Sequence, residues 1–466
     1  MKEVKSASVG KKSGSVGISI PLSVRASFKN AIVQSSIMLG FFLGVNKLFG
    51  FAEKILIANY FGTSSEADVF IVVQGMFITG WVFVEEIVSP ALIPVLSSIG
   101  KNAESDQRAR LVRWILVILA PAIILGLMAS VILQKQIGQL LYPGLDESSK
   151  EMVRNLWLYF CVAALPYFLT PILQAYANAN KRFFAPAFSA AIGRTCMIVV
   201  FIMAVRSTGL MGAGIGMVVY ACVYFGLLFF LVRIPLRRLS ESVSNRILHQ
   251  KNVAQLALPL LIGFVFSQAC QWIDVRYGSQ LAKGTLSGLA FSKKLIDVPV
   301  LLLSFCVGTV LLPYLSGFAA DGNIRSFKRY VNRSMILCFI AYGLGLLLFL
   351  IGAEQIVKMV YARGRFDAAS IAVTAGLLKY YAPGLLVFSC EIIVMQASFA
   401  VRNHWTAIIV GMICASLNMT ATILLVPQFG AMVIPLAVVG QKGLKTAILW
   451  LFLRKKLSAI EAIRAS

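Results

Sequence analysis

The sequence carries little charge for its length. Charged residues make up 13% of the 466 residues, and hydrophobic residues make up 59%. A soluble domain carries about 25% charged residues. Apolar runs of about 20 residues, the length that crosses a bilayer, recur along the whole chain. The composition therefore excludes an ordinary soluble protein and predicts an all-α polytopic membrane protein.

The residue types that build metal sites and disulfides are scarce or badly placed. Only two histidines are present, His249 and His404. The eight cysteines lie in apolar runs and form no Cys-x-x-Cys pair. Cysteines in such runs behave as small hydrophobic residues. We therefore expect no metal and no cofactor.

Long segments outside the apolar runs are also lacking. The longest connections on one predicted side of the membrane, 135–152 and 353–370, are short. A membrane-embedded glycan polymerase or ligase needs room there for catalytic carboxylates, so we expect no enzyme activity. No nucleotide-binding motif is present, so transport would depend on Na⁺, H⁺ or the membrane potential.

The apolar runs predict about twelve transmembrane helices. Residues 1–30 lack the apolar core of a signal peptide and predict a disordered cytoplasmic tail. We expect an N-terminal six-helix lobe over 31–233, a cytoplasmic linker over 234–251, and a C-terminal six-helix lobe over 252–454. Residues 455–466 would form a second cytoplasmic tail.

The net charge of +24 does not indicate a nucleic-acid partner. Lysine and arginine gather in the short loops that follow the even-numbered spans, which is the positive-inside pattern. Both termini are therefore expected in the cytoplasm, with the chain in a bacterial inner membrane as a monomer surrounded by lipid. Some predicted spans exceed the bilayer thickness, and Pro299 and Pro383 are expected bend points.

An internal repeat divides the chain into halves. The segment from Gln136 to Tyr142 resembles the segment from Gln355 to Tyr361, at an offset of 219 residues. Ala91–Ser97 and Val310–Ser316 match at the same offset. An even number of spans per repeat gives both halves the same orientation, related by a pseudo-twofold axis along the membrane normal. Two such lobes enclose a central cavity that rocking opens to each side alternately.

Charges inside the apolar runs of the first half are candidate functional residues, because burying a charge in the bilayer is costly. Lys47 and Lys54 are seven residues apart and share one face of the first span, with Glu53 about 100° away. A basic cavity face and snorkelling to water both explain this pattern. Asp68 fits either a functional or a helix-dipole role, and Glu85 lies in a segment too apolar for a loop.

The second half repeats this arrangement. Asp274 and Arg276 fall close to Glu53 and Lys54 in the repeat, near the outer end of the seventh span. In the eighth span Lys293 and Asp297 are four residues apart and are expected to form an ion pair. Lys294 then faces elsewhere and is free to meet an anion. Snorkelling or pairing between helices explains the remaining charges equally well: Arg194, Lys379, Glu391, Lys442 and Lys445.

These candidates place more positive than negative charge around the inferred cavity. Phosphate groups fit that balance better than a cationic drug does. The residues alone therefore favour transport of a phosphorylated substrate.

Several segments resemble the MurJ/MviN family of lipid II flippases, within the multidrug/oligosaccharidyl-lipid/polysaccharide exporter superfamily. The likeness runs through both halves, and its most specific segments are Gly308–Pro313 and Gly364–Ala368. Further matching stretches are Asn46–Lys54, Ala58–Gly62, Ala67–Phe70, Phe83–Glu85, Ala91–Leu96, Phe291–Pro299 and Gly308–Ser316.

The resemblance implies two six-helix lobes around a cationic cavity. It also implies a substrate of undecaprenyl pyrophosphate carrying a glycan, moved from the inner to the outer leaflet. Lys47 and Lys294 stand where the family has arginines. The acids Asp68, Glu85 and Asp297 stand at acidic positions of the family. Contacts with the pyrophosphate are expected from Lys47, Lys54 and Lys294, supported by Asp68, Glu85, Glu53, Asp274, Arg276, Lys293 and Asp297.

The chain also departs from the family pattern. Glu53-Lys54 inverts an Arg-Asp pair, and Gly80-Trp81 replaces an arginine pair. Counterparts of the family's thirteenth and fourteenth helices, which form a lipid-tail groove, are not predicted. Asn418 is present, but Thr422 replaces the acid expected four residues later in a sodium site. A flippase for an exopolysaccharide or O-antigen repeat unit, or a cation-coupled small-molecule exporter, therefore stays an alternative.

Overall fold

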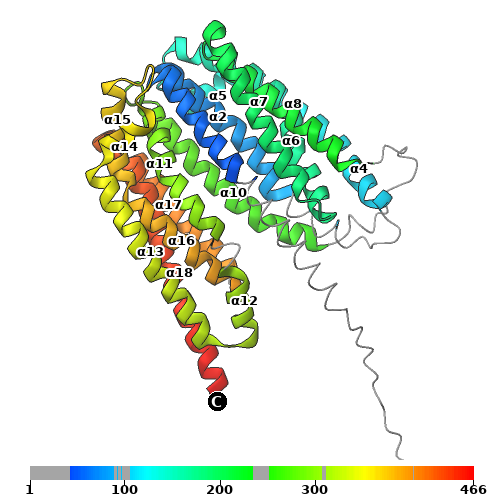
Figure 1. Cartoon of the computed structure of the whole chain (residues 1–466), viewed down its shortest axis with the longest axis vertical. Helices are drawn as coiled ribbons and strands as arrows, with labels where there is room; N and C mark the ends of the chain where they lie inside the picture. The colour runs from blue at the N-terminus through cyan, green and yellow to red at the C-terminus, as the bar shows by residue number, and fades with distance from the viewer. Residues whose placement is uncertain are drawn as a thin grey trace, which may run out of the picture.

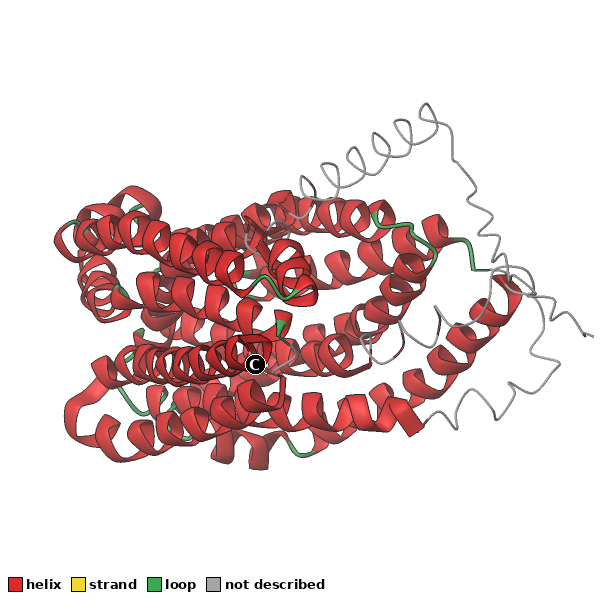
Figure 2. Cartoon of the chain, turned by 90° about the horizontal axis from the view of Figure 1, so that it is seen from below, coloured by secondary structure: helices red, strands yellow, loops and turns green. Residues whose placement is uncertain are grey.

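A computed structural model describes residues 42, 44–88, 92, 96, 105–234, 251–306, 311–401 and 404–465. Helices joined by short loops make up this described part (Figure 2). The predicted tail over 1–30 and the linker from 235 to 250 lie outside the described residues. The predicted cytoplasmic tail over 455–466 is described up to residue 465. It is helical there, because α18 continues to Ala465.

The N-terminal lobe is built around a long central helix, α6. This helix packs against α2, α4 and α8, while α7 packs against α8. An unlabelled helix over 44–61, dark blue in Figure 1, precedes α2. The labelled elements are α2 (Ser65–Phe83), the π-helical turn η1 (Val84–Val88), α4 (Ser105–Ile132), α5 (Gln134–Leu141), α6 (Glu147–Ala179), α7 (Phe184–Thr208) and α8 (Met211–Val232).

The C-terminal lobe repeats this plan around α16. This helix packs against α11, α13 and α18, while α17 packs against α10 and α18. Its elements are α10 (Lys251–Gly278), α11 (Thr285–Cys306), α12 (Leu312–Asp321), α13 (Ile324–Ile351), α14 (Ala353–Tyr361), α15 (Ala368–Tyr381), α16 (Pro383–Ala400), α17 (His404–Phe429), the 3₁₀ turn η3 (Gly430–Met432) and α18 (Val433–Ala465).

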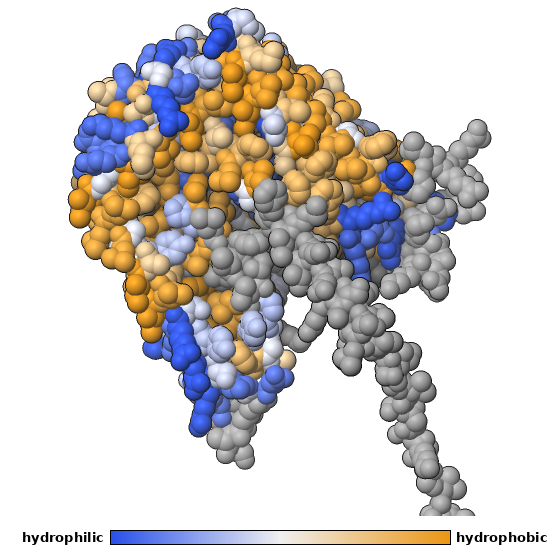
Figure 3. Space-filling model, viewed as in Figure 1, coloured by the Kyte–Doolittle hydropathy of each residue, from blue (hydrophilic) through white to orange (hydrophobic). Residues whose placement is uncertain are grey.

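The surface of the described part suits a bilayer. Eight stretches are long and apolar enough to cross a membrane. Figure 3 shows an apolar band across the helices with hydrophilic residues towards both ends. Helices α4 and α13 carry exposed apolar side chains such as Ile132 and Ile351, which suit a lipid environment. Helices α10 and α11 are not among the eight, which is consistent with the charges in their sequences.

The repeat seen in the sequence is a structural repeat. Its segments from Gln136 and Gln355 lie in two short helices, α5 and α14, which precede Asp146 and Asp367. Each of these aspartates accepts a backbone hydrogen bond, from Ser149 or Ser370, and so caps the helix that follows. The predicted fold class, two similar lobes of membrane-spanning helices, is confirmed.

One predicted span is broken in the structure. The predicted span over 371–400 consists of α15 and α16, which meet at Ala382. Pro383 starts α16 because it lacks the N–H that a continuing helix would need. The predicted span over 287–318 contains α11 up to Cys306 and α12 from Leu312, and residues 307–310 between them lie outside the described residues.

Candidate functional site

The two lobes contact each other at the end of the molecule that carries α5 and α14, the upper end in Figure 1. Asp68 of α2 is 4% exposed at this contact. Its two carboxylate oxygens accept hydrogen bonds from the backbone N–H groups of Gly284 and Ser287, each 2.7 Å long. Asp68 therefore caps the N-terminus of α11 across the lobe boundary, where the helix dipole favours a negative charge.

Two glycines lie at repeat-related positions of the same contact. A Cβ on Gly144 would meet the Ser279 carbonyl oxygen at 2.3 Å, and one on Gly364 would meet the Asn59 carbonyl oxygen at 2.2 Å. The Arg365 N–H donates to that Asn59 oxygen at 2.8 Å. These glycines allow the backbones of the two lobes to touch, which closes this end of the molecule.

Charged side chains surround this closed end. Lys283 forms an ion pair with Asp146 at 2.9 Å, and Arg365 forms one with Glu66 at 3.3 Å. Arg276 donates to the backbone oxygens of Gln139 and Leu140. The hydrogen bond from Ser149 and that from Lys283 lower the pKa of Asp146 to about 2, so this carboxylate is charged at neutral pH.

A cavity of about 520 Å³ lies in the N-terminal lobe and reaches Lys294 of α11. Its wall runs from the middle of the lobe to Asn178 and Phe183, where α6 ends and α7 begins. The cavity therefore extends towards the end opposite the lobe contact. Its lining carries four cations and two carboxylates: Lys47, Lys54, Arg194, Lys294, Glu53 and Glu85.

Glu53 organises the charges on one wall of this cavity. Its carboxylate pairs with Arg194 at 2.9 Å and accepts a hydrogen bond from the Gln74 side-chain nitrogen at 2.5 Å. The Gln74 side-chain oxygen in turn accepts a hydrogen bond from Lys54. The inverted Glu53-Lys54 order is thus accommodated by an arginine from α7, which sequence reasoning had counted only as a weak candidate.

Aromatic rings form much of the remaining wall. The Arg194 guanidinium lies 4.9 Å from the ring centroid of Tyr220, and Tyr220 stacks on Tyr224. Trp81, which replaces an arginine of the family pattern, lies beside Tyr167 on the cavity wall. The indole nitrogen of Trp81 and the side-chain oxygen of Asn46 are buried without a hydrogen-bond partner. Both remain available to a bound polar group.

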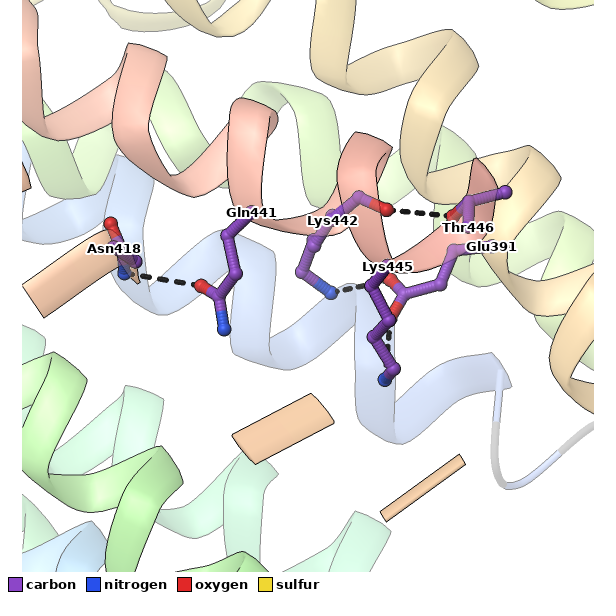
Figure 4. A network of polar contacts seen from close by, with 6 residues as sticks. All are labelled: Glu391, Asn418, Gln441, Lys442, Lys445 and Thr446. Atoms are coloured by element: carbon purple, nitrogen blue, oxygen red, sulfur yellow. Dashed lines mark hydrogen bonds and ion pairs between the residues drawn. The ribbon is translucent and has the colours of Figure 1, made fainter. Parts of the chain in front are cut away.

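A second chamber of about 450 Å³ lies inside the C-terminal lobe. Lys293 lines this chamber, whereas its neighbour Lys294 lines the N-terminal cavity, so α11 separates the two spaces. Glu391 of α16 pairs with Lys442 at 2.8 Å and with Lys445 at 2.9 Å (Figure 4). Pairing between helices was one of two explanations for these charges in the sequence, and the structure shows that Glu391, on α16, pairs with two lysines of α18 that follow it by 51 and 54 residues.

The chamber also holds a group of oxygen and nitrogen ligands around Asp274. Thr422 donates to Asp274 at 3.2 Å, and Asn418 donates to the Gln441 side-chain oxygen at 3.1 Å. The side-chain oxygen of Asn418 is buried without a partner. Among the described residues, no three His, Cys, Asp or Glu side chains gather as a metal site.

The predicted site residues thus fall into three groups. Lys47, Glu53, Lys54, Glu85 and Lys294 line one cavity, and Asp274, Lys293 and Asn418 line the other chamber.

Asp68 and Arg276 lie at the lobe contact, and Asp297 lines neither space. Both carboxylate oxygens of Asp68 accept hydrogen bonds from the backbone of α11, and the role of Asp68 towards the substrate stays a prediction. No ion pair joins Lys293 to Asp297, although both are described residues, and Lys293 faces the chamber instead.

Comparisons with known proteins agree with this architecture. The family model described as "Lipid II flippase MurJ" matches residues 57–465. A "Probable lipid II flippase MurJ" of Thermotoga maritima is 24% identical over 405 residues, which cover 86% of this chain and 81% of that protein. One from Bdellovibrio bacteriovorus is 29% identical over 181 residues, 39% of this chain and 34% of that protein.

The fold is shared with a solved structure. "Lipid II flippase MurJ, inward closed conformation" superposes with a TM-score of 0.75 at 21% identity, covering 92% of this chain and 90% of that one.

Proposed function

The chain belongs to the lipid II flippase MurJ family, and from that membership we propose how its two lobes move lipid II. It is a multi-pass inner-membrane transporter rather than an enzyme, and its substrate is a lipid-linked glycan. The residues that grip this substrate, the orientation of the chain and the energy source are the parts that we propose below.

We assign the pyrophosphate to the cavity of the N-terminal lobe. The observation that carries this assignment is the excess of cations over carboxylates on a wall enclosed by apolar helices. Lys47 and Lys294 approach from opposite lobes, and neither is tied by a described ion pair, so their ammonium groups are free to bind phosphate oxygens. The same excess disfavours small organic cations as the transported species.

Alternating access follows from the closure of one end. Both termini are cytoplasmic in this proposal, because lysine and arginine gather in the loops on that side. The contact that contains Asp68, Gly144 and Gly364 then faces the periplasm, and the cavity extends towards the cytoplasm. Lipid II enters from the inner leaflet, and rocking of the lobes separates this contact to release the headgroup outside.

Coupling to an ion is proposed at Asp274. Its carboxylate, the Thr422 hydroxyl and the partnerless Asn418 oxygen are hard oxygen ligands of the kind that Na⁺ prefers, and the carboxylate would equally carry H⁺. Asp274→Asn is expected to reduce ²²Na⁺ binding by the purified chain. If binding persists at the wild-type level, Na⁺ is not held at this aspartate.

The assignment of the pyrophosphate is tested by Lys47→Ala combined with Lys294→Ala. In a strain depleted of its own lipid II flippase, the wild-type chain is expected to restore growth and the double variant is not. Lys47→Arg with Lys294→Arg keeps both charges and serves as the matched control. Restored growth with the alanine variant, at equal membrane levels, would contradict the assignment.

A further inference from the structure

The chamber of the C-terminal lobe, which is partly open, has an unusual charge balance for a space among apolar helices. Its lining carries the lysines Lys293, Lys442 and Lys445 against the carboxylates Asp274 and Glu391. One positive charge is therefore left uncompensated. A charge in such surroundings is costly and marks a functional site unless a partner neutralises it.

The triad of Glu391, Lys442 and Lys445 shows which groups could offer the uncompensated positive charge to a bound anion. Each oxygen of the carboxylate takes one ammonium group, as Figure 4 shows. The Glu391 side chain is 11% exposed, whereas those of Lys442 and Lys445 are 38% and 19% exposed. The carboxylate thus lies behind the two ammonium groups, and each ammonium has three N–H donors, of which the carboxylate needs one.

Neighbouring side chains add a donor and fix the lysines. Gln441 accepts from Asn418 through its carbonyl oxygen, which leaves its NH₂ as a further donor on the chamber wall. The Lys442 ammonium lies 4.8 Å from the ring centroid of Phe388, which restrains this long side chain. One lysine would suffice to neutralise Glu391, so pairing alone does not account for the second.

We propose that this chamber is an oxyanion site, in which Lys442, Lys445 and Gln441 bind a carboxylate or phosphate group. Glu391 acts as an internal anion that holds the two ammonium groups in place. The group belongs to the transported headgroup, an assignment that rests on the proposed function. The headgroup would then be held on both sides of α11, by Lys294 in one space and by the lysine pair in the other.

Inorganic phosphate is the probe, titrated calorimetrically into the purified full chain in a zwitterionic detergent. A background of Lys47→Gln with Lys294→Gln removes the two ammonium groups of the other cavity that no described ion pair or hydrogen bond holds, and leaves Lys54 bonded to Gln74 and Arg194 paired with Glu53. In this background Glu391→Gln is expected to bind phosphate at least tenfold more tightly, because it removes the competing anion. Adding Lys442→Gln and Lys445→Gln, which leaves no unpaired charge, is expected to weaken binding at least tenfold.

Two controls keep the result interpretable. Lys455→Gln removes an exposed lysine from α18 outside the chamber and is expected to leave phosphate binding unchanged. Lys442→Arg with Lys445→Arg keeps both positive charges and keeps Glu391 paired. This variant is expected to bind phosphate with an affinity within threefold of the background, and it can be measured even if Glu391→Gln does not fold. The proposal is overturned if Glu391→Gln leaves affinity unchanged, or if the triple substitution retains it.

The source of the oxyanion is tested with lipid II in nanodiscs. With the other cavity intact, lipid II is expected to displace phosphate from the Glu391→Gln variant. Phosphate binding that lipid II does not change would overturn the assignment to the headgroup and indicate a free anion. This assay requires no translocation, so its failure is distinguishable from failure of the Lys47 and Lys294 growth test.

Discussion

The N-terminal cavity is rich in aromatic rings, which stand among its charged side chains, whereas the C-terminal chamber has few aromatic rings and holds its charges among small and aliphatic side chains. The helix-capping residues Asp146 and Asp367 are related by an offset of 221 residues, and the same offset leads from Thr170 to Glu391 and from Tyr224 to Lys445. The same places in two similar lobes thus carry a hydroxyl and a phenol in one half, and an ion pair in the other. The two lobes therefore share the arrangement of their helices but differ in the side chains that these helices carry at equivalent positions. This difference indicates different functions for the two spaces.

The largest expected effect comes from the buried acid of the N-terminal lobe. Arg194→Ala leaves Glu53 without its guanidinium partner, and removal of one partner of a buried pair costs about 3–5 kcal/mol. Thermal unfolding in detergent is expected to show this loss. Glu53→Gln with Arg194→Gln removes both charges and should recover most of it. If Arg194→Ala unfolds at the wild-type temperature, the ion pair with Arg194 is not what stabilises the Glu53 carboxylate. The contrast between the charges of the two lobes would then be smaller than the structure indicates.

The repeat-related glycines test whether the closed end is symmetric. An alanine methyl at Gly144 or Gly364 meets backbone oxygen at 2.3 or 2.2 Å, and overpacking of this kind costs about 1–3 kcal/mol. Both variants are expected to lengthen the distance between spin labels at 147 and 369, measured by pulsed electron paramagnetic resonance. Gly364→Ala should have the larger effect, because Gly364 has a φ of +59° that alanine disfavours. Equal distances in wild type and both variants would exclude this contact as the closure.

Substitution of Asp68 is expected to change the distance between the spin labels less than the glycine substitutions do. Only the N-terminal lobe contributes an aspartate at this position of the contact. Its repeat equivalent, at an offset of 219, is Ser287, whose N–H it binds. Asp68→Ala removes the cap on α11 at a cost of about 0.5–2 kcal/mol and should increase the open population. Asp68→Asn retains one acceptor and should lie between alanine and wild type in the same distance measurement. If Asp68→Asn gives the same distance as wild type, the negative charge is not the stabilising property.

The smallest effect concerns pH. The pKa of Asp146 is lowered to about 2, compared with about 3.9 for a free aspartate, so its contribution to closure is present above that free value. The contribution is lost only as pH falls towards about 2. Closure is therefore expected to be constant from pH 5 to 8 in the same labelled chain, with Lys283→Gln as the matched control. A change within that range would assign the titration to another group.

The sequence was sufficient for the features that depend on local pattern. Apolar runs predicted the helices, and the offset of 219 predicted the lobes. Lys47, Lys54 and Glu85 were singled out because each is a charge within an apolar run. The structure brings them to one cavity, while their role towards substrate stays a prediction.

What the sequence could not predict depends on contacts between distant segments. Arg194 and Glu53 are 141 residues apart, and only the packing of α7 makes them a pair. Asp68 had the same local signature as a cavity acid, and its true partners lie in the other lobe. Lys442 and Lys445 likewise looked like isolated charges, because Glu391 comes from another helix.

Adjacent residues of a helix point about 100° apart, and on α11 two such residues, Lys293 and Lys294, face different spaces. The helix therefore cannot turn to bring one ammonium closer to its cavity without moving the other. A ligand that turns α11 from one side would also move the lysine on the other side, and thermodynamic reciprocity requires any resulting change in affinity to be equal in both directions. The pair of lysines thus gives α11 one charged side chain in each space, so that a rotation of this one helix repositions both.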